Sequence, residues 1–548
     1  MTNMTCKADL HVHSWYSRDP SVWPLRKMGC AESYTNPQYL YQSMKDRGMD
    51  LVTITDHDVI DGNLEIAHLP DTFISEEVTA CFPADKCKVH VLVYNINEKQ
   101  HQDISRLREN VFELVQYLQT ANIFHALAHP MYSVDGELKV EHFQQLLLLF
   151  THFELNGARD SLQNAVLRRI LNGMSQERIS ELAERYAIAP SGEQPSRKYL
   201  ISGSDDHSSL YMGLSYTEVS EANCVQTFLR GIANNAHRVH TYEMGPQDLA
   251  HSLYSIIYQY YSQTFPFRQL VQDMAPFIFL EQTLLSAGQR EKRERQQPID
   301  WGMPDMAFLG SSFPGQFLQS AHEVLSAQPT WLEHSLETDL SLREQSQTWK
   351  TFVHRVFADL SADTGRDMLT KLSNADLFSL FPSLGAMTSF HLMLAPYLIS
   401  YSLFARDREF SLECLQLHDG QSSVQQSNGQ GLALFTDTFD ETNGVATAIR
   451  LRLEAARLTG KPLTVVHCAS GREQESNVAS FEPIGEFDLP EYPELQVHYP
   501  PFLDILAYCY EQRFTCIHAE TPGSMGLTAL AVARLLGLPF QEIGRAHV

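Results

Sequence analysis

The sequence is poor in positive charge and has no paired cysteines. Its 548 residues carry 41 lysines and arginines against 66 aspartates and glutamates, which gives a formal net charge of -25. This excess argues against a broad basic surface, so we expect no nucleic-acid partner. The nine cysteines are scattered and include no CxxC pair. Their spacing therefore argues against a zinc knuckle and favours reduced thiols in the cytoplasm.

An apolar leader and an unbroken apolar span are also missing. Residues 1–7 are short and polar, unlike a secretory signal peptide. Residues 377–405 carry no charge and are long enough to cross a bilayer, but Pro382, His391 and Pro396 interrupt them. We therefore favour a buried helix pair over a stable membrane span. Peripheral contact with a membrane stays open as an alternative.

Strand and helix patterns alternate over the first part of the chain. Apolar stretches read as strands at residues 50–58, 87–96, 123–130, 151–157 and 199–207. Between them lie helical patterns such as residues 103–122, with Ile104, Leu107, Val111 and Leu114 at helical spacing. This alternation predicts βα units that form a parallel sheet or a barrel.

The chain changes character twice after this part. Leucine-rich and aromatic helical patterns come first, then a polar linker rich in Gly, Ser and Gln, then a new strand–helix–strand unit. The length suits about three domains. We therefore predict an α/β domain, an all-helical domain, a linker, a partial α/β domain and a tail, at residues 1–243, 244–417, 418–430, 431–541 and 542–548.

Metal-ligand residue types recur in or at the ends of the predicted strands of residues 1–243. His11 and His13 stand one residue apart, and strand alternation points both imidazoles to one face. An ordinary half-exposed strand would explain this pair alone. Further residues of ligand type then follow: Asp56, His57, Glu77, His90, His129, Asp205 and His207. Because parallel strands end at one mouth of a barrel, and buried charges need a partner, the series predicts a metal site.

These motifs also carry a family resemblance. "DLHVHS", "TDHD", "SEEVT", "AHP" and "GSDDH" resemble, in order and spacing, the polymerase and histidinol phosphatase (PHP) family over residues 1–243. The resemblance implies a distorted (β/α)7 barrel that holds two to three divalent metal ions. Carried over by position, it implies three ligand groups: His11, His13, Glu77 and Asp205; Glu77, His90 and His129; Asp19, His57 and His207. Glu77 is preferred to Glu76 by the family pattern "EVT". Asp205 is preferred to Asp206 because it shares a face with His207.

The ligand types predict the chemistry. Mixed imidazole and carboxylate ligands suit Mn, Fe or Zn better than Mg or Ca. Closely spaced divalent ions lower the pKa of a shared water and clamp the oxygens of an in-line displacement, so we expect hydrolysis of a small-molecule phosphoester. Arg18 and Arg159 are predicted to meet the phosphate, with a surface ion pair as the alternative for each. Asp56 is predicted to serve the catalytic site by orienting a ligand.

The C-terminal region carries a second pattern. "TDTFDETNGVAT" places Asn443 and Gly444 between a strand and a helix, where backbone amides suit a diphosphate, although a plain turn would look the same. Together with "ETPGSMGLTALAVARLLGLP" it resembles the N-terminal Rossmann-like domain of retaining GT-B glycosyltransferases of the family 4 type. That resemblance implies a nucleotide-sugar donor near Asn443 and Gly444, and a sugar acceptor that the sequence does not identify.

The C-terminal domain reads as truncated. The final heptapeptide "EIGRAHV" corresponds to one frame of a common sequencing adapter, so we interpret residues 542–548 as an artefactual tail. We expect sugar transfer only from a full-length form.

The favoured prediction is a bifunctional-type protein, a PHP-type metal phosphoesterase joined to a truncated glycosyltransferase. The first alternative is a full-length glycosyltransferase with a regulatory metal-binding domain. The second is a metal-binding scaffold without catalysis.

Overall fold

The computed structural model describes residues 5–20, 23–264, 273–290, 299, 301, 313–337, 340–373, 393–419, 431–469, 477–489 and 492–542. Most of the predicted linker, the tail after residue 542, and residues 377–392 of the charge-free segment lie outside these residues. Among the described helices, none is both long and apolar enough to cross a membrane. All nine cysteines carry free thiols.

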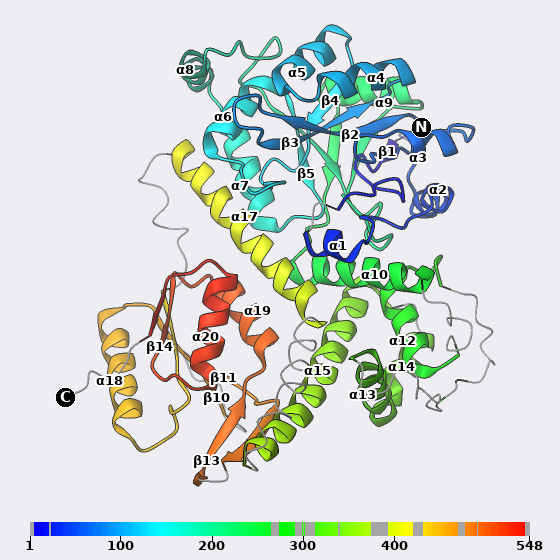
Figure 1. Cartoon of the computed structure of the whole chain (residues 1–548). Helices are drawn as coiled ribbons and strands as arrows, with labels where there is room; N and C mark the ends of the chain where they lie inside the picture. Colours follow the sequence, from blue (N-terminus) through cyan, green and yellow to red (C-terminus); the bar gives the residue numbers. More distant parts are fainter. Residues whose placement is uncertain are drawn as a thin grey trace.

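The N-terminal part contains two β-sheets, which confirms the α/β class (Figure 1). A five-stranded sheet has the order β2 (Ser75–Cys81), β3 (Lys88–Tyr94), β4 (Phe124–Leu127), β5 (His152–Asn156), β6 (Tyr199–Gly203). A three-stranded antiparallel sheet has the order β1 (Thr5–Ala8), β7 (Tyr216–Ser220), β8 (His237–His240). Its helices are α1 (Trp23–Met28), α2 (Pro37–Asp46), α3 (Asp61–Ile66), α4 (Glu98–Leu107), α5 (Val111–Thr120), α6 (Val140–Leu149), α7 (Ser161–Asn172), α8 (Gln176–Tyr186) and α9 (Val225–Ala233).

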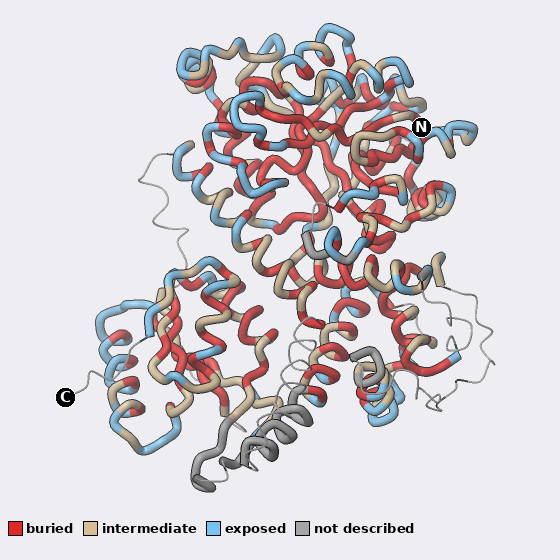
Figure 2. The backbone as a smooth tube through the Cα atoms, in the orientation of Figure 1, coloured by how far each residue is buried: buried red, intermediate tan, exposed pale blue. Residues whose placement is uncertain are grey.

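Strand direction departs from the expected parallel arrangement. In the five-stranded sheet β4 pairs parallel with β5 and β5 pairs parallel with β6, whereas β3 is antiparallel to both of its neighbours. The six residues between β2 and β3 are too few for a crossover, so this pair forms a hairpin. Residues 50–58, predicted as a strand, form only isolated bridges at Val52 and His57. The barrel layout therefore stays a prediction, while the strands form the buried centre of this part (Figure 2).

A layer of helices follows, in the region predicted to be helical. It comprises α10 (Pro246–Thr264), α12 (Ala275–Leu284), α13 (Phe313–Ala327), α14 (Pro329–Glu337), α15 (Leu342–Ser373) and α17 (Ala395–Asp419). Helix α17 enters two cores: Phe404 packs with the helical layer, whereas Cys414 and Leu415 pack with β2–β5 and their helices. Figure 1 shows α17 running between the N-terminal and C-terminal parts of the chain.

The C-terminal part is a separate parallel sheet. Its strand order is β11 (Val478–Phe481), β10 (Leu463–Cys468), β9 (Leu432–Phe435), β14 (Cys516–Ala519), β15 (Phe540–Glu542), and all four pairings between these strands are parallel. In chain order this reads 3-2-1-4-5, as in a doubly wound nucleotide-binding sheet. The remaining elements are α18 (Gly444–Thr459), α19 (Phe502–Gln512), α20 (Ser524–Leu535) and the hairpin β12 (Gly485–Leu489) with β13 (Tyr492–Tyr499).

Candidate metal centre

Glu77 on β2 is the hub of a buried cluster of imidazoles. Its Oε1 lies 2.8 Å from His90 Nδ1 and 2.9 Å from His129 Nε2. Its Oε2 lies 3.1 Å from His11 Nε2 and 3.1 Å from His57 Nδ1. Oε2 also lies 3.3 Å from His13 Nε2, so one carboxylate faces five histidines, an arrangement suited to a bridging metal ligand.

Asp205 is the second carboxylate of the cluster. Its Oδ1 lies 3.4 Å from His11 Nε2 and 3.5 Å from His13 Nε2, and 3.8 Å from His207 Nδ1. The neighbouring Asp206 accepts hydrogen bonds from Ser208 instead. Likewise Glu76 pairs with His101, so that Glu77 and not Glu76 faces the cluster.

Glu32 is a third carboxylate of the cluster, and none of the sequence motifs includes it. Its Oε2 lies 3.3 Å from His57 Nε2, and its Oε1 lies 3.9 Å from His207 Nε2. The predicted ligand Asp19 is exposed instead and lines a different pocket on the surface. The structure therefore places Glu32 beside His57 and His207 and does not bring Asp19 to them. Glu32 follows no strand, so no strand-end pattern marks it.

Buried hydrogen bonds fix the tautomers of two imidazoles. His11 Nδ1 lies 2.8 Å from the fully buried Glu154, and with a carboxylate oxygen as the acceptor His11 donates there and directs Nε2 into the cluster. Ser17 donates its hydroxyl proton to Asp56 and therefore accepts from His13 Nδ1 at 2.9 Å. Ser17 thus links Asp56 to the cluster, and the orienting role of Asp56 stays a prediction. Glu154, an acid within an apolar strand, could have been recognised from the sequence.

The strand ends carry backbone strain at two of these positions. His129 and Asp205, each two residues beyond a strand, have φ angles of 26° and 53°. This left-handed conformation costs energy for residues other than glycine and clusters at functional sites. His90 lies near the start of β3, but this strand is antiparallel, so its start meets the edge where β4 ends. One edge of the sheet thus collects ligands from strands of both directions.

The electrostatics of the cluster favour a cation. Burial alone would raise the pKa of Glu77, but His11, His90 and His57 lower it well below its ordinary value. Burial alone would lower the pKa of His57, because it disfavours the charged ring, but Glu77 and Glu32 raise that pKa to about 10. The carboxylates therefore stay ionised and draw positive charge into a buried site.

The donor set fits divalent ions. Three groups have ligand atoms that all lie within 4.8 Å of one another: His13, His57 and His207; His11, His13 and Asp205; His57, Glu77 and His90. Glu77 Oε2, His57 Nδ1 and His207 Nε2 are buried and make no hydrogen bond to any described residue. Orphaned polar atoms are costly unless an ion satisfies them. Imidazoles with carboxylates are the ligands that Mn, Fe and Zn share.

A cavity of about 80 Å³ adjoins the cluster. Arg159 lines it with its side chain buried: the guanidinium stacks 3.8 Å above the Tyr132 ring, and Nη2 lies 3.8 Å from Asp205 Oδ2. Its Nε makes no hydrogen bond within the described residues. The lining also includes the apolar side chains of Leu249 and Leu253 of α10. Arg18, the other predicted phosphate-binding residue, is exposed and does not line this cavity.

The predicted diphosphate loop lies far along the chain, at the start of α18. Asn443 caps this helix, with its side-chain oxygen accepting from the Ala446 amide at 2.8 Å, and Gly444 is exposed. At the neighbouring helix α20, the Asp437 carboxylate accepts from the Met525 amide and the Ser524 hydroxyl. A phosphate at α20 would have to displace Asp437, so of these two helix ends only that of α18 stays open to an anion.

Comparisons with known proteins cover only parts of the chain. No protein-family model matches it. Over 72 residues it is 36% identical to an uncharacterized protein of Methanocaldococcus jannaschii, a stretch that is 13% of this chain and 40% of that protein. The chain thus spans less than half the length of the curated relative it matches.

Three solved structures are similar over nearly their whole lengths. PsfC from Pseudomonas syringae gives a TM-score of 0.27 at 15% identity, over 47% of this chain and 98% of PsfC. A candidate metal-dependent phosphoesterase from Bifidobacterium adolescentis gives a TM-score of 0.24 at 14% identity, over 42% of this chain and 96% of that chain. An amidohydrolase from Chromobacterium violaceum, solved with bound sulfate and no metal, gives a TM-score of 0.24 at 15% identity, over 41% of this chain and 96% of that chain. Because these TM-scores are low, the conclusions on function rest on the geometry of the site.

Proposed function

We propose that the chain is a divalent-metal-dependent phosphoester hydrolase of the PHP type. The observation that carries the proposal is the buried cluster around Glu77, which adjoins a cavity lined by the buried guanidinium of Arg159. Carboxylate and imidazole ligands together with a cation along one cavity suit a phosphate that contacts both.

The cluster offers places for two to three ions. His11, His13, Glu77 and Asp205 would hold the first, and Glu77 with His90 and His129 the second. Glu32, His57 and His207 would hold a third, in place of the set with Asp19. When bound, such ions act as Lewis acids and make water a nucleophile near neutral pH.

The remaining residues bind and position. Arg159 would pair with a phosphate oxygen, and the Tyr132 ring under its guanidinium fixes the direction of its N–H groups. Ser17 and Asp56 would hold His13 so that Nε2 stays available. The leucines of α10 would keep bulk water from the reacting group.

Metal content and phosphatase activity of the full chain test this proposal. We expect bound Mn, Fe or Zn and turnover of a small phosphomonoester that a chelator abolishes and added metal restores. His11→Ala should lose at least one ion per chain and most of the activity. His68→Ala is the matched control, because His68 is exposed and outside the cluster. A full chain that binds no metal, or turnover that His11→Ala leaves unchanged, would refute the proposal.

A second function is favoured by the strand order of the C-terminal sheet, 3-2-1-4-5 with all strands parallel. We propose that this sheet is part of a GT-B type glycosyltransferase that uses a nucleotide-sugar donor in a full-length form, with Asn443 and Gly444 near the diphosphate. The metal-binding part would then be a second enzyme or a regulatory or scaffolding domain. Sugar transfer by the full-length form, measured with and without His11→Ala, separates these roles: a transferase whose rate depends on His11 favours regulation.

A further inference from the structure

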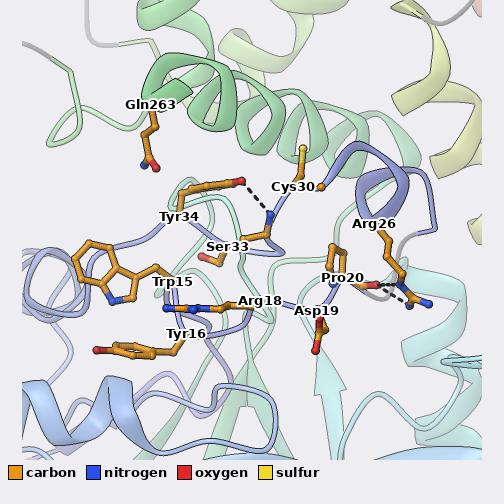
Figure 3. Close-up of a pocket in the computed structure, with 12 residues that line it drawn as sticks. Trp15, Tyr16, Arg18, Asp19, Pro20, Arg26, Cys30, Ser33, Tyr34 and Gln263 are labelled. Atoms are coloured by element: carbon orange, nitrogen blue, oxygen red, sulfur yellow. Dashed lines mark hydrogen bonds between the residues drawn. The ribbon is translucent and has the colours of Figure 1, made fainter. Parts of the chain in front are cut away.

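A second pocket, of about 670 Å³, lies on the outer side of the segments that supply the metal centre. Figure 3 shows its lining, which comes from the loop after His13, from residues 26–34 and from the end of α10. Two of its segments also carry residues of the cluster. Trp15 and Tyr16 come after His13 and Ser14, and Ala31 and Ser33 flank Glu32. This pocket is therefore lined by close neighbours in the chain of the proposed metal ligands.

The pocket combines aromatic rings with a positive charge. Trp15, Tyr16 and Tyr34 line it, and Trp15 is 39% exposed, so part of its ring is open to a ligand. Its charged lining is two arginines, Arg18 and Arg26, against the single Asp19, so the pocket is positive by one charge on a chain whose net charge is -25. A local excess of positive charge on such a chain would attract an anion.

Most of the polar groups in this pocket are already engaged. Tyr16 donates its hydroxyl to Glu65 at 2.6 Å, and the Tyr34 hydroxyl accepts from the Ala31 amide at 2.9 Å. Arg26 donates two hydrogen bonds to the Pro20 carbonyl. These bonds hold the walls in place, so the pocket is largely preformed.

Arg18 is the exception among these groups. Within the described residues it forms no hydrogen bond and no ion pair, and Figure 3 shows its guanidinium beside Trp15 and Tyr16, with Tyr34 across from it. An unengaged guanidinium next to the exposed ring of Trp15 is suited to an anion that carries a ring of its own.

We propose that this pocket binds a phosphate-bearing ring compound, with the ring stacked on Trp15 and the phosphate on Arg18. Nucleotides and sugar phosphates share this chemistry, and the volume suits either. Stacking on an aromatic side chain tolerates different rings, whereas a guanidinium fork selects the phosphate. The site is distinct from the metal centre, so binding there requires no metal ion.

The test is calorimetric titration of the full chain in the presence of a chelator, with four probes: uridine monophosphate, glucose 6-phosphate, uridine and inorganic phosphate. We expect at least one of the two ring phosphates to bind more tightly than uridine or phosphate alone. Trp15→Leu and Arg18→Gln should each weaken this binding about tenfold or more, and Trp15→Phe should largely restore it because a ring is retained. His11→Ala should leave it unchanged.

Arg185→Gln is the matched control, because Arg185 is exposed and lies 5.3 Å from the Tyr186 ring, away from this pocket. Binding of the nucleotide alone identifies a base as the ring, and binding of the sugar phosphate alone identifies a sugar. The proposal is overturned if neither ring phosphate binds more tightly than inorganic phosphate. It is equally overturned if Arg18→Gln weakens binding and Trp15→Leu does not, or if Arg185→Gln has the same effect as Arg18→Gln.

Discussion

A buried histidine on α10 should make the lining of the cavity beside the Glu77 cluster sensitive to acid. His251 is fully buried, with Nε2 2.6 Å from the Thr283 carbonyl of α12 and Nδ1 3.3 Å from the Tyr211 hydroxyl. Nε2 must carry the proton to donate to a carbonyl, and a neutral ring then accepts from Tyr211 through Nδ1. Burial lowers the pKa of His251 from 6.5 to about 4, so the folded state keeps the ring neutral.

The magnitude follows from this difference in pKa. Between about pH 6.5 and pH 4 the unfolded chain binds a proton on His251 that the folded chain does not, so stability falls as the pH falls through this window. This shift lowers the free energy of unfolding by about 3 kcal/mol once the pH reaches 4, and by roughly 2 kcal/mol between pH 7 and pH 5. Since α10 supplies Leu249 and Leu253 to the cavity wall, acid should loosen that wall.

Hydrogen exchange of the α10 and α12 amides, corrected for intrinsic rates, measures this opening directly. His251→Gln keeps a donor for Thr283 but does not titrate. We expect the opening free energy of α10 to fall about 2 kcal/mol more in the wild type than in His251→Gln between pH 7 and pH 5. Equal pH dependence in both proteins would refute the reasoning, because other buried histidines contribute equally to each.

Three further predictions concern the ligands and the contacts between domains. Glu32→Gln should lower the metal content measured by elemental analysis, whereas Asp19→Asn should not, because only Glu32 lies beside His57. Leu253→Ala should cost about 2–5 kcal/mol of stability by leaving a void at the cavity wall, which chemical denaturation of the α10 region measures. Tyr510→Phe removes a buried 2.8 Å hydrogen bond to Asp160 and should lower stability by about 1.5–3 kcal/mol. Faster amide hydrogen exchange in α19 measures this loss, and Tyr261→Phe is the control at an exposed tyrosine.

Sequence patterns predicted which residues gather in the candidate site better than they predicted the sheet. His11 and His13 with Glu77, His90, His129, Asp205, His57 and His207 do lie in one cluster, because ligand types at strand ends are local features of the sequence. Strand direction is not local. The antiparallel β3 follows from a short turn and from pairing with β4, which apolar runs alone do not reveal.

Glu32 shows why the rest of the site escaped prediction. It lies on a segment without a strand, and its place beside His57 depends on how residues 29–34 pack under α10. Asp19 has the right spacing in the sequence, but its segment turns outward to the surface pocket. Spacing in the sequence can predict ligands on regular strands. A loop can direct its side chains either to the cluster or to the surface pocket, and spacing does not show which.

Helix α17 has a consequence for how the chain can be divided. Its Leu403 lines the metal cavity, and its Arg408 binds both Asp160, beside Arg159, and the Tyr510 carbonyl of α19. An excised fragment of residues 1–243 would lose this helix and α10, and would expose leucines that are covered in the whole chain. The metal-binding part is therefore not a portable module. A fragment that keeps α17 has to extend at least to residue 419. Recombination between homologues should therefore be tolerated after α17 rather than before it.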